Sequence, residues 1–371
     1  MIATYLLIIA LVAFPCLVIL RSRRRAKQGG KAVRGGPFAS RWIRTRFDPA
    51  AFGLVPTAAL DPRRAGPEPD PAHRAEAQKT ADAAWEGDWR VAAAYCEAAG
   101  SDWDERWSRI ELLIHVAGSD DRWLTDWRSA QPENGDAGTV FAMLLVRRAW
   151  EIRGAEYAHK VPDANMRQFR SMLPSAMAAA QQVADRAPHD PGPWVVMLTA
   201  ARAMGYSHSQ FSDLWRNLQL RAPHHMAAHT QALQYWCAKW SGSDTSMFDF
   251  AVRAVAGAPA GSPLPGLYLQ ALDEVARRDG FRGSRADLSV KARLRDVAQR
   301  LDTLAPDHDD LPRLRHRLAH HLLVAGMYRE ALVQFQHIGP YCGASPWNQD
   351  AAGAVAAFDH ARGRAAYGSR R

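Results

Sequence analysis

Acidic residues are missing from the first 47 positions of this chain, although its 371 residues include 38 Asp and Glu. The same 47 positions carry ten Lys and Arg, so they hold a charge of +10, and residues 48–371 sum to −1. The formal net charge of +9 therefore belongs to one N-terminal arm. Because the remaining body is electrically balanced, it lacks the basic face that duplex binding requires, and we expect no nucleic-acid partner.

Cysteine is scarce as well. The four cysteines are far apart and include no Cys-x-x-Cys pair: they are Cys16, Cys96, Cys237 and Cys342. That spacing excludes a disulfide framework. We expect these side chains to act as small buried hydrophobic groups in a reducing compartment.

Motifs for catalysis and nucleotide binding are absent too. The chain contains no Gly-x-Ser-x-Gly, no Walker loop and no Gly-x-Gly-x-x-Gly that follows a strand. Its clustered carboxylates stand where helices are expected to begin, and there they cap N–H groups and favour the helix dipole. These carboxylates are Asp102, Asp104, Glu105, Asp307, Asp309 and Asp310. We therefore expect no catalytic residue, no metal and no bound cofactor.

A long uncharged run opens the chain. Residues 2–20 contain no charged side chain, and a helix of this length, at about 1.5 Å per residue, spans roughly 28 Å, close to the hydrocarbon thickness of a bilayer. Basic residues follow this run and none precedes it, which is typical of an uncleaved anchor rather than a secretory signal. The positive-inside rule then places the N-terminus outside and the C-terminal body in the cytoplasm. We expect residues 1–20 to be a single transmembrane anchor in the inner (cell) membrane, with a cleaved signal as the alternative.

Two connecting segments follow. Residues 21–47 form a basic juxtamembrane arm, whose first part should attract anionic lipid headgroups at about 1 kcal/mol per basic residue near the surface. The predicted membrane-surface residues are Arg21, Arg23, Arg24, Arg25 and Lys27. Residues 48–71 hold six prolines, which predicts an extended, semi-rigid linker that keeps the body off the bilayer. Trp42, Ile43 and Phe47 should contact either the membrane interface or the body.

Alternation of period two, the mark of strands, is nearly absent from residue 72 onward. Apolar residues recur instead at i, i+3, i+4 and i+7, with Gly, Pro and Asp between the segments, which predicts roughly fourteen or fifteen helices. The clearest helical segments are 136–154, 163–187, 193–205 and 311–326. We expect an all-α body over residues 72–360 and a disordered basic tail over residues 361–371.

A helix-ending proline recurs in this body. The pairs Ala187-Pro188 and Ala222-Pro223 lie 35 residues apart, and Ala305-Pro306 closes a third helix. Each pair follows a long amphipathic helix and precedes a polar break. A spacing near 34 residues favours a solenoid of helical hairpins over a bundle.

The hairpin pattern is clearest in residues 312–338. The turn Gly326-Met-Tyr328 is flanked by packing positions Leu318, Ala319, Leu322, Ala331 and Phe335. This stretch resembles the tetratricopeptide repeat, and residues 194–223 resemble it more loosely, with Trp194 at the aromatic position of the first helix. The resemblance implies a tetratricopeptide-like α-solenoid whose concave face takes a peptide or a partner's helix. The block 148–194 also resembles an uncharacterised actinobacterial family, which implies a bacterial source and no particular activity.

The stretch Gly87-Asp-Trp89-Arg-Val-Ala92 repeats the turn phrase Gly326-Met-Tyr328-Arg-Glu-Ala331. It predicts a second tight turn, with a glycine that relaxes the backbone and an alanine where two helices come close. Tryptophans recur four residues apart at Trp85/Trp89, Trp103/Trp107, Trp123/Trp127 and Trp236/Trp240. Where both members belong to one helix they share a face, so we expect core residues of successive hairpins. The alternative is an aromatic-lined groove in the N-terminal part of the body.

Two histidine clusters are the arrangement closest to a metal site. They are His224, His225 and His229, and His316, His320 and His321. Each contains an i, i+4 pair, a spacing that zinc sites on helices use. Neither contains the Glu of His-Glu-x-x-His or a nearby Cys, and Arg315 and Arg317 would repel a cation. We expect surface or helix-capping histidines, and a metal-dependent enzyme that uses either cluster is the alternative.

These observations predict a membrane-tethered protein that binds a protein or peptide partner, as an adaptor or scaffold, rather than an enzyme. Basic residues that recur on the first helices of the hairpins suit an acidic partner. The candidate partner-binding residues are Arg147, Arg148, Arg202, Arg315 and His316. A purely structural protein of the envelope or division machinery is a further alternative.

Overall fold

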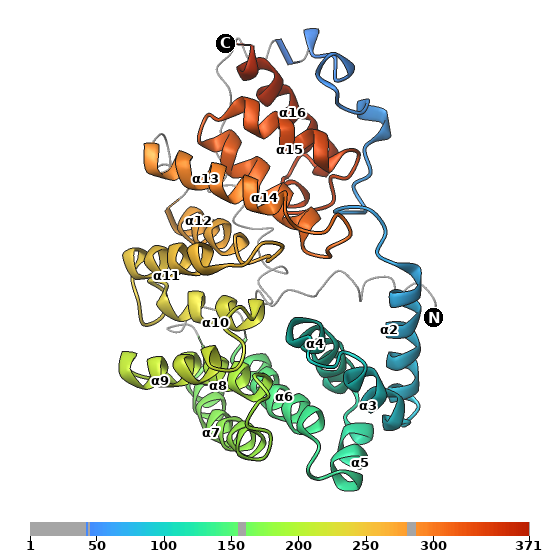
Figure 1. The fold of residues 1–371 in the computed structure, drawn as a ribbon, viewed down its shortest axis with the longest axis vertical. Coiled ribbons are helices and arrows are strands. Elements are labelled where there is room, and N and C mark those ends of the chain that lie inside the picture. Colours follow the sequence, from blue (N-terminus) through green and yellow to red (C-terminus); the bar gives the residue numbers. More distant parts are fainter. Residues whose placement is uncertain (1–41, 44, 155–160, 280–286, 371) are drawn as a thin grey trace. The chain divides into compact units, whose positions relative to one another are not determined.

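The computed structural model describes residues 42–43, 45–154, 161–279 and 287–370 (Figure 1). In those ranges the regular elements are helices, with one isolated bridge between Asp61 and Tyr341. The predicted all-α class is therefore confirmed for the described part of the chain.

The described residues form two compact units. Unit 1 holds those of 70–243, and unit 2 holds those of 24–69 and 244–371. The body predicted as one domain over residues 72–360 thus consists of two units. Unit 2 combines the described residues before residue 70 with residues from 244 onward, which are far from them in the sequence.

Unit 1 is a succession of helices in which chain neighbours pack together. In order they are α2 (Pro71–Trp85), α3 (Trp89–Glu97), α4 (Trp103–Ser119), α5 (Arg122–Ala130), α6 (Gly135–Arg153), α7 (Asp163–Arg186), α8 (Gly192–Met204), α9 (His208–Gln219) and α10 (Met226–Trp236). Consecutive helices such as α2 and α3, α6 and α7, and α8 and α9 lie against each other, and α4 and α8 both contact α6 (Figure 1). This repeat-like arrangement is the one that the sequence periodicity predicts.

Local chemistry sets the ends of these helices. Helix α6 begins after Asn134, whose side chain accepts a hydrogen bond from the backbone N–H of Ala137 at 3.0 Å. It ends at Gly154, whose φ of 71° suits a residue without a Cβ. Helix α9 begins with a capping box between Ser207 and Gln210. The predicted ends of α6, α7 and α8 are confirmed to within one residue.

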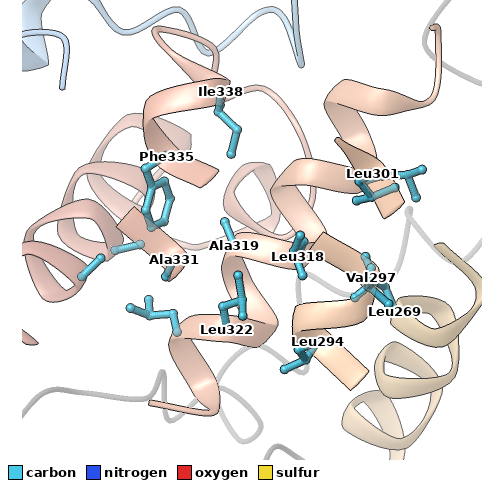
Figure 2. Packing of buried hydrophobic residues seen from close by; sticks show 14 of the residues in the cluster. Leu269, Leu294, Val297, Leu301, Leu318, Ala319, Leu322, Ala331, Phe335 and Ile338 are labelled. Atoms are coloured by element: carbon cyan, nitrogen blue, oxygen red, sulfur yellow. The ribbon is translucent and has the colours of Figure 1, made fainter. Parts of the chain in front are cut away.

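The longer helices in the described part of unit 2 follow residue 243. They are α11 (Asp244–Gly257), α12 (Gly266–Asp279), α13 (Leu288–Leu301), α14 (Leu311–Val324), α15 (Tyr328–Ile338) and α16 (Ala354–Ser369). Part of the core lies between α13, α14 and α15, where Leu318 of α14 lies toward Val297 and Leu301 (Figure 2). On its other side, α14 places Ala319 toward Phe335 of α15. Burial of these apolar side chains is the main force that holds the three helices together.

Tight turns at two glycines confirm the predicted hairpins. Gly87 joins α2 to α3 with φ 98°, and Gly326 joins α14 to α15 with φ 73°. In this region of φ other residues are strained and glycine is not. Ala92 and Ala331 are fully buried, as expected where two helices approach closely.

The tryptophan pairs differ in whether a turn separates their members. Trp123 and Trp127 both lie on α5, are buried, and stack with ring centroids 6.3 Å apart. In contrast, Trp85 ends α2 and is 54% exposed, whereas Trp89 begins α3 and stacks on Trp127. The prediction that Trp85 is a core residue is wrong, because the turn at Gly87 places the pair on two different helices.

Residues 48–71, predicted to be an extended linker, are packed against unit 2 for most of their length. Leu54 and Leu60 belong to the buried core of unit 2. The backbone carbonyl of Val55 accepts a hydrogen bond from the guanidinium of Arg362 at 2.8 Å. Prolines keep the segment out of helical structure, but its leucines and carbonyl groups bind the C-terminal helices. The segment is therefore part of unit 2 up to Pro69.

The C-terminal tail also differs from its prediction. Helix α16 continues to Ser369, so the tail predicted to be disordered over residues 361–371 is helical for most of its length. Ala365 and Ala366 are fully buried in it. Small residues at these positions let α16 pack closely against its neighbours, and this packing outweighs the polar composition of the tail.

Trp42, Ile43 and Phe47 contact the body. The ring centroid of Trp42 lies 5.4 Å from that of Tyr367 on α16. A Cβ on Gly363 would lie 2.9 Å from Ile43 and 3.3 Å from Phe47, so this glycine leaves the room that both side chains occupy. The alternative of contact with the body is thus the one that the structure shows.

In the described ranges, no helix combines the length and the apolar character needed to cross a bilayer. The predicted anchor, residues 1–20, lies outside those ranges. So does the basic arm up to residue 41, with its predicted membrane-surface residues Arg21, Arg23, Arg24, Arg25 and Lys27.

Candidate functional site

A cleft in unit 1 lies where α5 ends and α6 begins, with α7 forming the opposite wall. Its volume is about 210 Å³. The polar and aromatic side chains that line it include Arg128, Gln131, Asn134, Phe141 and Arg186. Figure 1 shows α5, α6 and α7; Gln131 and Asn134 come from the short connection between α5 and α6.

Arg128 is a cation of this cleft that has no opposite charge beside it. Its Cζ lies 3.5 Å from the ring centroid of Phe141, within cation–π range. Burial lowers the pKa of Arg128, yet a guanidinium remains protonated at neutral pH. Among the described residues no carboxylate lies within ion-pair distance of it, whereas Arg186 pairs with Glu133 at 3.3 Å. The fold thus leaves one positive charge in the cleft without a counter-charge.

Two hydrogen bonds fix the side-chain amide of Gln131. Its Oε1 accepts one from the indole N–H of Trp127 and one from Nδ2 of Asn134, both at 3.0 Å. Asn134 is held in turn by the backbone N–H of Ala137. Because the oxygen of Gln131 is occupied by these donors, its Nε2 group is the end that can donate to a ligand.

Glycines bring α6 and α7 together beneath the cleft. A Cβ on Gly138 would lie 2.4 Å from Cγ2 of Val183, so a larger residue would push the two helices apart. A Cβ on Gly135 would lie 3.4 Å from Oδ2 of Asp190. Gly135 lines the cleft and also lies next to the carboxyl group of Asp190, so the first residue of α6 stands between the two.

An ionic cluster lies in the interior next to this point. Arg106 donates from Nε and Nη2 to the two carboxylate oxygens of Asp136, at 2.8 and 2.7 Å, and Asp136 is 2% exposed. Asp190 accepts a hydrogen bond from the backbone N–H of Gly192 at 2.7 Å. Burial raises the pKa of Asp190 to about 6, and the nearby charge of Asp136 adds to this effect. The bidentate pair holds α4 against α6, and α6 forms one wall of the cleft.

Two of the five predicted partner-binding residues, His316 and Arg202, are buried, and a third, Arg315, is largely covered. His316 is 0% and Arg202 is 8% exposed, and the guanidinium of Arg202 lies 5.1 Å from the ring centroid of Trp240. The side chain of Arg315 is 12% exposed and pairs with Asp302 at 3.1 Å. The prediction that His316 and Arg202 face a partner is wrong, because neighbouring helices and the segment before residue 70 cover them. Arg315 stays a candidate, since it pairs with the half-exposed Asp302.

Arg147 and Arg148 are partly exposed, but each is engaged within unit 1. Arg147 pairs with Glu151 at 3.2 Å, and Arg148 pairs with Asp121 at 2.9 Å. Surface pairs of this kind contribute at most about 1 kcal/mol. A partner could compete with them, so both residues stay candidates.

Both ring nitrogens of His316 are occupied. Its Nε2 lies 2.9 Å from the carbonyl oxygen of Ala65, and its Nδ1 accepts a hydrogen bond from the indole N–H of Trp347 at 2.9 Å. Burial lowers the pKa of His316 to about 4, so the ring is neutral and the proton is on Nε2. His321 lies 2.8 Å from a carboxylate oxygen of Asp273. A metal ion would have to displace these bonds, so the geometry does not favour a metal centre here.

The first histidine cluster caps a helix. His225 is the N-cap residue of α10, and its side chain accepts a hydrogen bond from the backbone N–H of Ala228. His229 uses Nδ1 to bind the carbonyl oxygen of His225 at 2.9 Å. Burial lowers the pKa of His225 to about 3 and that of His229 to about 4, so both rings are neutral. His224 is exposed. His225 and His224 thus have the capping and surface roles that we expected. The expectation is wrong for His229, and for His316 and His321 of the second cluster, because neighbouring side chains bury all three.

Within the part of the chain that the structure describes, no three His, Cys, Asp or Glu side chains are gathered so that they could hold a metal ion. His320, the remaining cluster member, packs with its ring centroid 5.7 Å from that of Trp347. Cys96, Cys237 and Cys342 are buried, and burial raises the pKa of Cys96. A thiol in this setting lacks the thiolate character of a nucleophile.

The cleft is not one of the sites that the sequence predicts. Its lining has one aromatic ring, Phe141, so it is not the aromatic-lined groove that the tryptophan pairs suggested. Two weak signals point to it. The stretch Gln131-Pro-Glu-Asn-Gly135 joins two helices through polar residues, and Gly135 and Gly138 are spaced for close helix contact.

Comparisons with models of protein families, with curated proteins and with solved structures found no match for this chain. The resemblances to the tetratricopeptide repeat and to the actinobacterial family therefore stay predictions.

Proposed function

We propose that this chain is a membrane-tethered adaptor or scaffold that binds a protein or peptide partner in the cytoplasm and has no catalytic role. The observation that carries the proposal is the cleft of unit 1, where Arg128 lies without a counter-charge among fixed polar groups. Helices rather than loops provide most of its walls, and binding sites on such elements keep their geometry.

The succession of hairpins supports a tetratricopeptide-like solenoid. Helices α6, α7, α8 and α9 pack in series, each against the next. The turns at Gly87 and Gly326 share a positive φ and a buried alanine five residues later. Repeat proteins of this kind bind partners through surfaces that several hairpins build together.

The N-terminal sequence supports the tether. Residues 1–20 are long and apolar enough in sequence to span a bilayer, and Arg21 to Lys27 suit anionic headgroups. Because residues 48–69 pack into unit 2, the basic arm leads directly into folded structure. The proposed mechanism is local concentration: the anchor holds the partner at the cytoplasmic face of the inner membrane.

A metal-dependent enzyme built on the histidine clusters has less support. His316 uses both ring nitrogens within the fold, and His225 serves as a helix cap. No observation favours a specific reaction at either cluster.

Chemical crosslinking of the full chain in cells, followed by mass spectrometry, tests the proposal. We expect a reproducible partner set in the membrane fraction. A set that is stoichiometric under all growth conditions indicates a scaffold, and a condition-dependent set indicates an adaptor. The matched control replaces residues 1–20 by an unrelated membrane anchor, and this variant should keep the partner. Recovery of no partner above background, or a stoichiometric metal together with turnover in the purified chain, would contradict the proposal.

A further inference from the structure

We propose that the cleft at the α5–α6–α7 junction is a carboxylate-binding site, with Arg128 as its anchor, and that it takes an acidic group of a partner peptide. This inference rests on the proposed function and deepens it by naming the chemistry of the ligand. It assigns the site to residues that the sequence did not single out.

The position of Arg128 carries the argument. Its guanidinium lies 3.5 Å from the ring centroid of Phe141, which holds it in place against the ring. A guanidinium held in this way can still present its fork of N–H donors to a carboxylate, and two parallel hydrogen bonds are the strongest arrangement for that pair. Removal from water has a cost that a bound anion would offset.

Other arginines of unit 1 show what Arg128 lacks. Arg106 forms a bidentate pair with Asp136, and Arg148 pairs with Asp121. The fold thus neutralises these partly buried guanidinium groups with its own carboxylates. Arg128 is left for a carboxylate that another molecule supplies.

The rest of the cleft fits one carboxylate. Arg186 is already paired with Glu133 and also donates to the carbonyl of Pro132 at 2.9 Å, so this side of the cleft is balanced. The oriented Nε2 group of Gln131 adds a neutral donor. With Glu133 paired, Arg128 is the one uncompensated charge among the described residues of this lining, and a single positive charge balances a monoanion but not a dianion such as phosphate. A monoanionic carboxylate is the group that matches this set.

The size of the cleft points to a side chain or chain end rather than a cofactor. Sites for drug-sized ligands and cofactors measure roughly 300–1,000 Å³. The cleft measures about 210 Å³. An Asp or Glu side chain and a C-terminal carboxylate share the required chemistry, and the two sources are separated by experiment.

Fluorescence anisotropy with the full chain in detergent micelles tests the assignment. The first probe is a C-terminally amidated peptide of alternating Glu and Ala that carries an uncharged fluorophore without a carboxyl group, and the second carries the same fluorophore. The second replaces every Glu by Gln and ends in an unblocked carboxylate. Binding of the first probe assigns the site to acidic side chains, and binding of the second assigns it to a chain terminus.

Arg128→Gln should weaken binding of the active probe by roughly tenfold or more, because a charge-assisted pair is lost. Arg216→Gln is the matched control: Arg216 is exposed on α9, pairs with Asp213 and lies outside the cleft lining, so binding should not change. Binding by the basic arm is the same in both variants and cancels in the comparison. Arg128→Lys keeps the charge without the fork and should give an intermediate loss.

Equal affinity of Arg128→Gln and the unchanged chain for both probes would overturn the inference. So would a lack of binding to either probe, or displacement of the probe by inorganic phosphate at concentrations where acetate has no effect. These results are separable from a failure of the proposed function. If Arg128→Gln captures its partner in cells at the full level, the cleft is not the binding site, but the adaptor proposal stands. If no partner is captured by the unchanged chain, the adaptor proposal itself is wrong.

Discussion

Replacing Arg362 by alanine should detach residues 48–69 from unit 2. Arg362 lies on α16 and is fully buried. Its Nη1 donates to the carbonyl of Val55 at 2.8 Å, its Nη2 pairs with Asp359, and its Cζ lies 5.6 Å from the ring centroid of Phe358. Alanine would leave the carbonyl and the carboxylate without this donor and would remove a large buried side chain.

The structure sets the size of this effect. Removing one partner of a buried ion pair costs about 3–5 kcal/mol. The side chain of Asp359 is 24% exposed, so water replaces part of the lost donor. We therefore expect the lower end, about 3 kcal/mol, which is roughly 6–12 °C in melting temperature for a unit of this size. Arg362→Lys keeps the charge but loses one arm of the guanidinium fork. Its stability should lie between those of the unchanged chain and Arg362→Ala.

Two assays check this prediction. Thermal unfolding of the full chain gives the shift, and limited trypsin digestion reports the detached segment through faster cleavage after Arg63 and Arg64. Arg253→Ala is the control, because Arg253 is exposed on α11 of the same unit. An Arg362→Ala chain that melts like the control and keeps the segment resistant to trypsin would refute the reasoning.

Three further predictions concern Asp190, the two glycines Gly138 and Gly326, and Trp347. Asp190 has a pKa of about 6 in the folded chain, against about 4 when unfolded. The folded state therefore binds its proton more tightly, and stability falls as the pH rises from about 4 to about 6, by roughly 2–3 kcal/mol. Asp190→Asn should remove this component from urea midpoints measured across that range, and an unchanged pH profile would contradict the assignment. Gly138→Ala should destabilise unit 1 by roughly 1–3 kcal/mol through overlap with Val183. Gly326→Ala should cost about 1 kcal/mol from its positive φ alone, since no atom lies within 4 Å of the added Cβ. Thermal melts compare the two, and equal shifts would count against the packing argument. Trp347→Phe should cost roughly 1–3 kcal/mol, because the buried Nδ1 of His316 loses its donor, and a urea midpoint within error of the unchanged chain would contradict this.

Local features of the fold could be predicted from the sequence because local chemistry determines them. The apolar period of 3.6 residues and the glycine at position 154 define α6. The glycines at 87 and 326 define turns, because their backbone conformation strains any other residue. These signals depend on a few neighbouring residues, so no knowledge of distant contacts is needed.

Contacts between distant segments could not be predicted in the same way. Nothing near Leu54 indicates that it enters a core formed by helices more than 200 residues later. The burial of His316 likewise depends on Ala65, which covers it from the segment before α2. Periodicity assigns a residue to a face of a helix, but it does not tell which other segment covers that face.

The candidate site illustrates the same limit. Recurrence on the helices predicts that several arginines bind a partner, but Arg202 among them is buried. Arg128 differs from Arg147, Arg148 and Arg315 because no described carboxylate lies within ion-pair distance of it, a property that depends on the arrangement of three helices. A sequence lists the charges, and only the fold shows which of them are neutralised.

Hydrogen exchange measured by mass spectrometry on the full chain, with and without the active peptide probe, tests the central claim most directly. The account predicts slower exchange in residues 124–141 and 176–187, which surround the cleft, and no such slowing in Arg128→Gln. Slowing confined to residues 21–47, or equal slowing around the cleft in Arg128→Gln, would contradict it.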